Sequence, residues 1–315
     1  MKVPHWFHRL AAVLVAAVTA VLVVAVPSAS ASPPGADHRP PYLDSIESRY
    51  AETDLATFHY TVTGSGSPVV LIAGGGLWQY SWRDVIPELA RRHTVYAVEM
   101  PSQGYTELRR KDFAFDLPAM SAAIGSFLDA VGLERTALVG HSWGGAWSLY
   151  FAEQHPERVT KLALLDSPGL NAEKAPTTAI FTAPALGELA MALSTREVYT
   201  QGIRSTFHHK ELVTDVMMNE LWPPFTRPDN RDGFLALWRN LDFRLTDAAL
   251  GQVTAPTLVL WGEQDEVLPS SQAHGLAARI PNATATILPG CGHTVHEDCP
   301  ATAIPPLTNF LTPVA

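Results

Sequence analysis

The sequence predicts an α/β protein with a mostly parallel sheet, helices on both faces of that sheet and an inserted helical cap. Short apolar runs typical of buried strands alternate with helical patterns along most of the chain. One of these runs enters a helix through a glycine-flanked serine. Between residues 168 and 252 the strand pattern stops and helical patterns take its place. An insertion of this kind is expected above the carboxyl ends of the strands, where open α/β sheets bind ligands.

The elements follow in a regular order along the chain. Periodic helical patterns are expected at 118–131 in the core and at 185–198, 211–221 and 231–241 in the insertion. Strands are expected at 58–63, 69–73, 95–99, 136–139, 161–165, 257–261 and 284–288. These elements divide the chain into a core of 55–168 and 253–315, a helical cap of 169–252 and a flexible segment of 32–54.

Residues 1–31 have the pattern of a secretory signal peptide. Lys2 and Arg9 precede an apolar run at 10–26, and Ala29-Ser-Ala31 offers small residues for cleavage. We expect an exported protein, with an uncleaved N-terminal membrane anchor as the alternative because the run approaches the length that spans a bilayer. Cleavage would remove two of 22 basic residues and none of the 31 acidic ones. The acidic balance that remains disfavours nucleic acid and anionic membranes as partners.

The stretch Thr136-Ala-Leu-Val-Gly-His-Ser142-Trp-Gly-Gly reads as a strand, a sharp turn and the start of a helix. Gly140 and Gly144 allow the tight turn that lifts a serine hydroxyl above a sheet. A serine hydroxyl is a weak nucleophile unless a histidine takes its proton and a carboxylate orients that histidine. The pattern therefore predicts that Ser142 is a nucleophile, provided that both partners exist downstream.

Both partners are found in loops that follow predicted strands. Asp265 follows the apolar run 257–261, and His293 lies in a glycine-rich loop. Asp166 remains a rival acid because it also follows a strand, and His296 remains a rival base. The expected triad is Ser142, Asp265 and His293, in the chain order of the α/β-hydrolase fold.

These motifs resemble those of the α/β-hydrolase superfamily from about residue 58 to residue 311. The run at 69–78 is similar to the family's strand and oxyanion loop, with Ala73 where a histidine is common, and Glu99 replaces a usual aspartate. The segment 221–231 resembles the cap of the haloalkane dehalogenase and epoxide hydrolase branch. Enzymes of that branch attack with an aspartate, so the resemblance does not carry their activities to a chain with Ser142.

The oxyanion of a tetrahedral intermediate needs backbone N–H donors, which we expect from Trp143 and Gly75. The glycine run that contains Gly75 is not a dinucleotide fingerprint, because Gln79 takes the place of its third glycine. A substrate pocket is expected from Trp78, Trp222 and Phe225, although packing in the core is the simpler explanation for any single aromatic residue.

Cofactors and metals are not expected. His208-His209 lacks the partner spacing of a metal site. The two cysteines, Cys291 and Cys299, flank His293 and are expected to form a disulfide in an exported chain.

The expected function is a secreted serine hydrolase that cleaves a small or medium carboxylic ester. A prolyl aminopeptidase-like amidase, a perhydrolase and a carbon–carbon bond hydrolase remain alternatives on the same triad. The amidase would need a cap acid to hold a substrate ammonium group. The candidate acids are Glu188, Glu211, Glu220 and Asp229. A secreted binding protein on a hydrolase scaffold is the alternative outside enzymes, and the sequence does not determine the oligomeric state.

Overall fold

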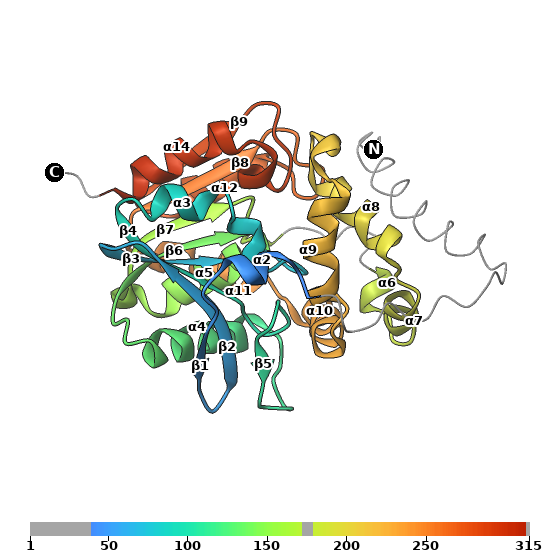
Figure 1. The fold of residues 1–315 in the computed structure, drawn as a ribbon. Coiled ribbons are helices and arrows are strands. Elements are labelled where there is room, and N and C mark those ends of the chain that lie inside the picture. The colour runs from blue at the N-terminus through green and yellow to red at the C-terminus, as the bar shows by residue number, and fades with distance from the viewer. Residues whose placement is uncertain (1–38, 172–178, 313–315) are drawn as a thin grey trace.

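The computed structural model describes residues 39–171 and 179–312 (Figure 1). The predicted signal peptide, 1–31, lies outside the described residues. The sheet has the order β1-β2-β4-β3-β6-β7-β8-β9, and β5 pairs with β2. Pairing is parallel from β4 through β3 to β9, and β1, β2 and β5 form the antiparallel part. The predicted α/β-hydrolase fold with a mostly parallel sheet is confirmed.

The strands form where the apolar runs predict them. Seven expected strands correspond to observed ones, and two short strands were missed because they pair at the antiparallel edge and carry little apolar signal. The strands are β1 (Arg49–Glu52), β2 (Ala56–Thr63), β3 (Ser67–Ile72), β4 (His93–Val98), β5 (Glu107–Leu108), β6 (Thr136–His141), β7 (Val159–Leu165), β8 (Thr257–Gly262) and β9 (Ala283–Leu288).

The expectation of a flexible segment at 32–54 is wrong for part of its length. Residues 42–45 form helix α2, and residues 49–52 form β1, which pairs antiparallel with β2. Leu43 and Ala51 are buried against the core. Apolar contacts and ladder hydrogen bonds therefore order a segment whose composition is polar.

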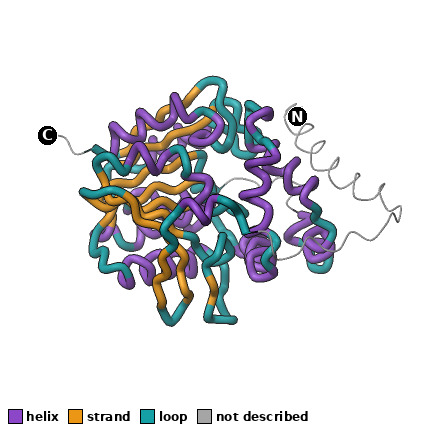
Figure 2. Tube along the Cα trace, viewed as in Figure 1, coloured by secondary structure: helices purple, strands orange, loops and turns teal. Residues whose placement is uncertain are grey.

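Helices cover both faces of the sheet, and Figure 2 shows them around the strands. Successive residues of β3 point to opposite faces. Val69 and Leu71 pack in one core cluster with α3 and α14, whereas Val70 and Ile72 pack in the other with α4, α5 and α12. The core helices are α3 (Val85–Leu89), α4 (Leu117–Ala130), α5 (Trp143–Gln154), α12 (Ser271–Arg279), α13 (Val295–Asp298) and α14 (Pro300–Leu311).

The described part of the expected cap, from residue 179 to residue 252, contains helices and no strand. The expected helix at 185–198 is two helices, α7 and α8, because the chain turns at Thr195, whose side chain caps α8 by accepting the Val198 N–H. The helices are α6 (Ala179–Thr182), α7 (Leu186–Ala192), α8 (Arg196–Thr206), α9 (Asp215–Phe225), α10 (Pro228–Asn240) and α11 (Arg244–Ala249).

Hydrogen bonds attach these helices to the loops at the carboxyl ends of the strands. The Tyr199 hydroxyl donates to Gly76 O at 2.8 Å, in the loop after β3. The Thr294 N–H donates to Thr206 O at 3.1 Å, just before α13. Within the described ranges, no helix is both long and apolar enough to cross a membrane.

Candidate active site

Ser142 lies in the turn between β6 and α5, with φ 50° and ψ −124°. A non-glycine residue adopts a positive φ at a cost, and such strain is common where a side chain must be presented for function. A Cβ at Gly140 would lie 2.4 Å from Gly144 O, and a Cβ at Gly144 would lie 2.4 Å from Ala73 O. Both glycines are therefore required for the turn to close over the sheet.

The structure brings Ser142, His293 and Asp265 together. His293 Nε2 lies 3.0 Å from Ser142 Oγ, and His293 Nδ1 lies 2.8 Å from Asp265 Oδ2. The other carboxylate oxygen of Asp265 accepts the N–H groups of Val267 and Leu268 at 2.7 and 2.8 Å. These bonds fix the carboxylate so that it holds the Nδ1–H tautomer and leaves Nε2 free to accept the serine proton.

The rival acid Asp166 has a different position. Its carboxylate accepts the Gly262 N–H at 2.8 Å and the Val295 N–H at 3.2 Å, and it is fully buried. Burial, with the nearby negative charge of Asp265, holds the pKa of Asp166 well above its ordinary value. Asp166 thus ties the end of β8 to the start of α13, while Asp265 contacts the histidine.

The rival base His296 is also held away from the serine. Its Nε2 lies 3.0 Å from Ser81 Oγ, and its ring stacks on Trp82 with centroids 4.4 Å apart. Burial, together with the charge of Arg83 and the neighbouring His293, lowers the pKa of His296 to about 3. The neutral, buried ring of His296 therefore has a packing role in the core beneath the His293 loop.

His141 supports the catalytic histidine in a way that the sequence did not reveal. Its Nε2–H donates to the backbone carbonyl of His293 at 3.0 Å. Burial lowers the pKa of His141 well below its ordinary value, so the ring is neutral and Nε2 carries its proton. The residue before the nucleophile therefore anchors the loop that carries the base, and only long-range contacts could reveal this role.

The two residues expected to supply the oxyanion donors are in direct contact. A Cβ at Gly75 would lie 2.1 Å from Trp143 Cε3, so the glycine packs directly on the indole. Trp143 is the first residue of α5, where a helix leaves its N–H without an intrahelical partner. In the described part of the chain, neither the Trp143 N–H nor the Gly75 N–H donates a hydrogen bond to a protein group. Both donors are therefore available to a bound oxyanion.

Aromatic rings from the cap pack around the Trp143 ring, beside these donors. The Trp143 ring lies 5.3 Å from that of Phe234 and 5.0 Å from that of Trp238, both on α10. The Phe225 ring lies 5.5 Å from that of Phe234. A Cβ at Gly76 would lie 3.3 Å from Phe234 and 3.6 Å from Phe225, so the rings reach the glycine loop. We call Trp143, Phe225, Phe234 and Trp238 the aromatic wall.

Of the three expected pocket residues, only Phe225 belongs to the aromatic wall. Trp222 is its neighbour, with its ring 6.1 Å from that of Phe225 and 5.5 Å from that of Tyr199. Trp78 is fully buried, and its Nε1–H donates to Glu220 O at 3.1 Å. Its ring packs against Tyr42, Tyr80 and Tyr105. The pocket role expected for Trp78 is therefore corrected to a packing role, because a fully buried ring cannot touch a substrate.

The two cysteines, Cys291 and Cys299, form a disulfide across the His293 loop. Between them, the buried carboxylate of Asp298 accepts the Gly292 N–H at 2.6 Å and the N–H groups of His208 and His209 at 3.0 and 2.9 Å. His209, Asp298 and Cys299 approach one another closely enough to suggest a metal site. The disulfide takes the Cys299 sulfur and backbone donors occupy the carboxylate, so the cluster joins the cap to the histidine loop instead.

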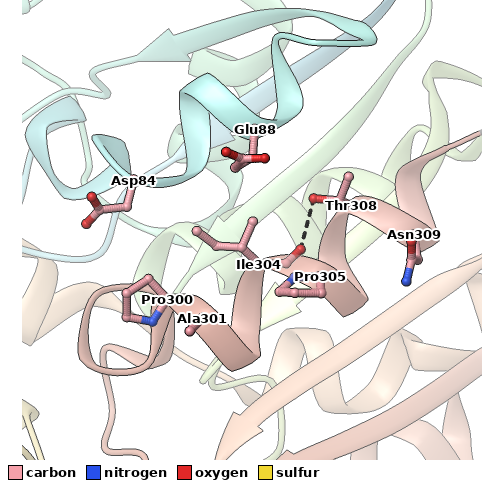
Figure 3. Close-up of a pocket in the computed structure, with 8 residues that line it drawn as sticks. All are labelled: Asp84, Glu88, Pro300, Ala301, Ile304, Pro305, Thr308 and Asn309. Atoms are coloured by element: carbon pink, nitrogen blue, oxygen red, sulfur yellow. Dashed lines mark hydrogen bonds between the residues drawn. The ribbon is translucent and has the colours of Figure 1, made fainter.

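A surface groove lies apart from the triad, between α3 and α14 (Figure 3). Asp84 and Glu88 line one side, and residues of α14 line the other. The Thr308 hydroxyl on that side donates to Ile304 O within the helix at 2.9 Å. The groove holds no member of the triad or of the aromatic wall.

Comparison with known proteins supports the fold and the family of this chain. A family model described as alpha/beta hydrolase fold matches residues 67–300. A 2-hydroxy-6-oxo-6-phenylhexa-2,4-dienoate hydrolase of Burkholderia cepacia is 28% identical over 251 residues, which cover 77% of this chain and 87% of that protein. A 2-hydroxy-6-oxo-2,4-heptadienoate hydrolase of Pseudomonas putida is 30% identical over 246 residues, 74% of this chain and 84% of that protein.

Among solved structures, Cfl2 from Burkholderia cenocepacia superimposes with a TM-score of 0.75 at 26% identity, over 84% of this chain and 95% of that one. The chain belongs to the α/β-hydrolase fold family, and it is an enzyme of the hydrolase class.

Proposed function

We propose that this hydrolase cleaves a small or medium, uncharged carboxylic ester through an acyl-enzyme on Ser142. The observation that carries the proposal is the chain of hydrogen bonds from Ser142 through His293 to Asp265. Ser142 Oγ attacks the ester carbonyl while His293 Nε2 takes its proton. The oxyanion accepts the N–H groups of Gly75 and Trp143. His293 then protonates the leaving alcohol, and a water attacks the acyl-enzyme by the same route.

An uncharged acyl group fits the surroundings of the serine better than an ionic one. The aromatic wall offers ring faces and edges, which bind apolar groups. The arginines of α10 have partners elsewhere: Arg239 pairs with Glu188 at 2.8 Å, and Arg231 donates to the carbonyls of Met191 and Ser194. Only Arg239 is paired with a carboxylate, whereas the buried Nε of Arg231 has no partner among the described residues.

Hydrolysis of a carbon–carbon bond is the second candidate, because several relatives are named as hydrolases of 2-hydroxy-6-oxo-dienoates. Such substrates carry a carboxylate, which needs a cation or several donors when it is buried. On α10, Arg239 is already paired with Glu188, so a dienoate carboxylate would depend on Arg231.

The amidase alternative gains no support from the four candidate acids of the cap, all of which lie in the described residues. Glu188 is engaged by Arg239, and the Glu220 carboxylate accepts the Tyr42 N–H at 3.1 Å. Glu211 and Asp229 are exposed on the surface. The four acids considered from the sequence therefore give no support to a site for a substrate ammonium group.

A substrate panel tests the proposal directly. Purified protein is assayed with 4-nitrophenyl esters of increasing acyl length, aminoacyl amides and a 2-hydroxy-6-oxo-dienoate. We expect the highest kcat/KM with an uncharged ester. A dienoate cleaved at a higher kcat/KM than every ester would transfer the assignment to carbon–carbon bond hydrolysis.

We also propose that the protein is exported. The signal-peptide pattern of residues 1–31 supports this, and so does the disulfide, because disulfides persist in oxidising compartments. Expression of the full chain with a C-terminal tag, followed by N-terminal sequencing of the protein from the medium, tests it. A mature N-terminus near Ser32 is expected, and an intact N-terminus in the membrane fraction would support the anchored alternative.

A further inference from the structure

The Gly75 N–H can stabilise an oxyanion only if the peptide between Gly74 and Gly75 faces the right way. Glycine has more backbone freedom than any other residue, so a run of three glycines does not hold this orientation by itself. Hydrogen bonds to the carbonyl groups of the loop must therefore supply the restraint.

Gln103 contacts this loop through its side-chain amide. Its Nε2 donates to Ala73 O at 2.9 Å and to Gly74 O at 2.8 Å, and its Oε1 accepts the Met100 N–H at 3.0 Å. Two acceptors on one side and a donor on the other permit only one orientation of the amide. The side chain is buried, so water does not compete for these bonds.

The carbonyl that Gln103 holds belongs to the same peptide group as the Gly75 N–H. In a trans peptide the C=O and the N–H point in opposite directions, and the described residues contain no cis peptide bond. Gly74 O also accepts the Leu77 N–H at 3.1 Å. Fixing this carbonyl therefore fixes the direction of the Gly75 N–H.

The opposite side of the loop lies against the nucleophile. A Cβ at Gly74 would lie 3.1 Å from Ser142 Cβ and 2.8 Å from His141 Nδ1. The glycine loop thus passes between Gln103 on one side and the serine turn on the other. Close packing sets the distance of the loop from Ser142, and the Gln103 amide sets the rotation of its peptide.

We propose that Gln103 is a positioning residue that orients the Gly75 N–H toward the oxyanion. The inference rests on the proposed hydrolysis at Ser142 and adds a residue that touches neither substrate nor triad. Gln103 acts on the loop through two carbonyl groups. We therefore expect it to stabilise the transition state, in which the oxyanion forms.

The segment that carries Gln103 is itself held in an unusual conformation. Ser102 has φ 74° and Gly104 has φ 48°. A Cβ at Gly104 would lie 2.1 Å from the Glu99 carboxylate, which accepts the Tyr105 N–H at 2.5 Å. Glu99, which stands where the family usually has an aspartate, thus fixes the turn around Gln103.

The test replaces Gln103 by methionine, which keeps the side-chain length and removes both donors. We expect kcat for the best ester to fall about 10- to 100-fold with KM within about threefold, because misaligning a donor costs less than the roughly 10²- to 10³-fold of losing one. The pH profile of kcat/KM should keep its shape, because His293 and Asp265 are untouched. Gln272→Met is the matched control, since Gln272 is also a buried glutamine, and it should retain the wild-type kcat.

A crystal structure of the Gln103→Met protein separates this inference from the proposed function. We expect the peptide between Gly74 and Gly75 to rotate or shift while Ser142, His293 and Asp265 stay in place. An unmoved peptide would overturn the inference, as would a kcat within threefold of wild type in a folded variant. If the wild-type protein hydrolyses no ester, the proposed function fails, and the position of this peptide in the variant still decides the role of Gln103.

Discussion

Removal of the Cys291–Cys299 disulfide should destabilise the protein by an amount that depends on the length of the loop that the disulfide closes. The two cysteines are separated by 8 residues. In the chain-entropy model, closing a loop of this length lowers the conformational entropy of the unfolded chain by about 8 cal/mol/K. This stabilises the folded protein by about 2.5 kcal/mol at 25 °C. For a protein of this size, each kcal/mol lowers Tm by roughly 2 °C, so a loss of about 5 °C is expected.

The variant for this test is Cys291→Ala with Cys299→Ala. Alanine avoids placing a hydroxyl at position 291, where the side chain is buried. Calorimetric unfolding is measured with and without reductant for wild type and variant. The wild-type protein should lose stability on reduction, and the variant should not respond.

The catalytic consequence should be smaller than the loss of stability. After reduction, Asp298 still accepts the Gly292 N–H, and His141 still donates to the carbonyl of His293. We therefore expect a modest fall in kcat at temperatures where the fold survives. Two results would refute the reasoning: a variant within about 0.5 kcal/mol of wild type, or two free thiols alkylated in the freshly purified, denatured, unreduced protein.

Four further substitutions test the site. Ser142→Ala should lower kcat by about 10⁴-fold or more. A fluorophosphonate should label the wild-type peptide that contains Ser142. A folded Ser142→Ala variant that keeps most of its activity would exclude this nucleophile. Asp265→Asn should cost on the order of 10³- to 10⁴-fold in kcat through the wrong histidine tautomer. Asp166→Asn should mainly lower Tm, because it removes an acceptor from a buried N–H; the reverse ranking of the two kcat losses would give the acid role to Asp166. Phe225→Ala should change the relative kcat/KM among acyl lengths, by roughly 1 kcal/mol for each lost methylene contact. An equal loss of kcat/KM for all esters would show that this ring does not select the acyl group. Trp222→Ala, at a neighbouring ring outside the aromatic wall, is the control.

The sequence by itself determined the fold class and predicted Ser142, Asp265 and His293 as the triad, with Asp166 and His296 left as rivals. Apolar runs predict buried strands because a parallel sheet is covered on both faces. The glycines around Ser142 predict the turn because no other residue fits so close to the neighbouring backbone. Asp265 and His293 could be named because each follows a strand in a short loop, and the carboxyl ends of parallel strands meet at one edge.

Contacts between distant parts of the chain decided the rest. Asp166 and Asp265 both follow strands, and only the packed loops show that Asp265 reaches His293 while Asp166 accepts backbone donors. Trp78 and Phe225 have the same apolar chemistry, and only burial and ring contacts separate a packing residue from a member of the aromatic wall. Gln103 carries no local signal at all. Its two hydrogen bonds to the glycine loop span about 30 residues of sequence. Such partners are set by tertiary packing, which local periodicity does not encode.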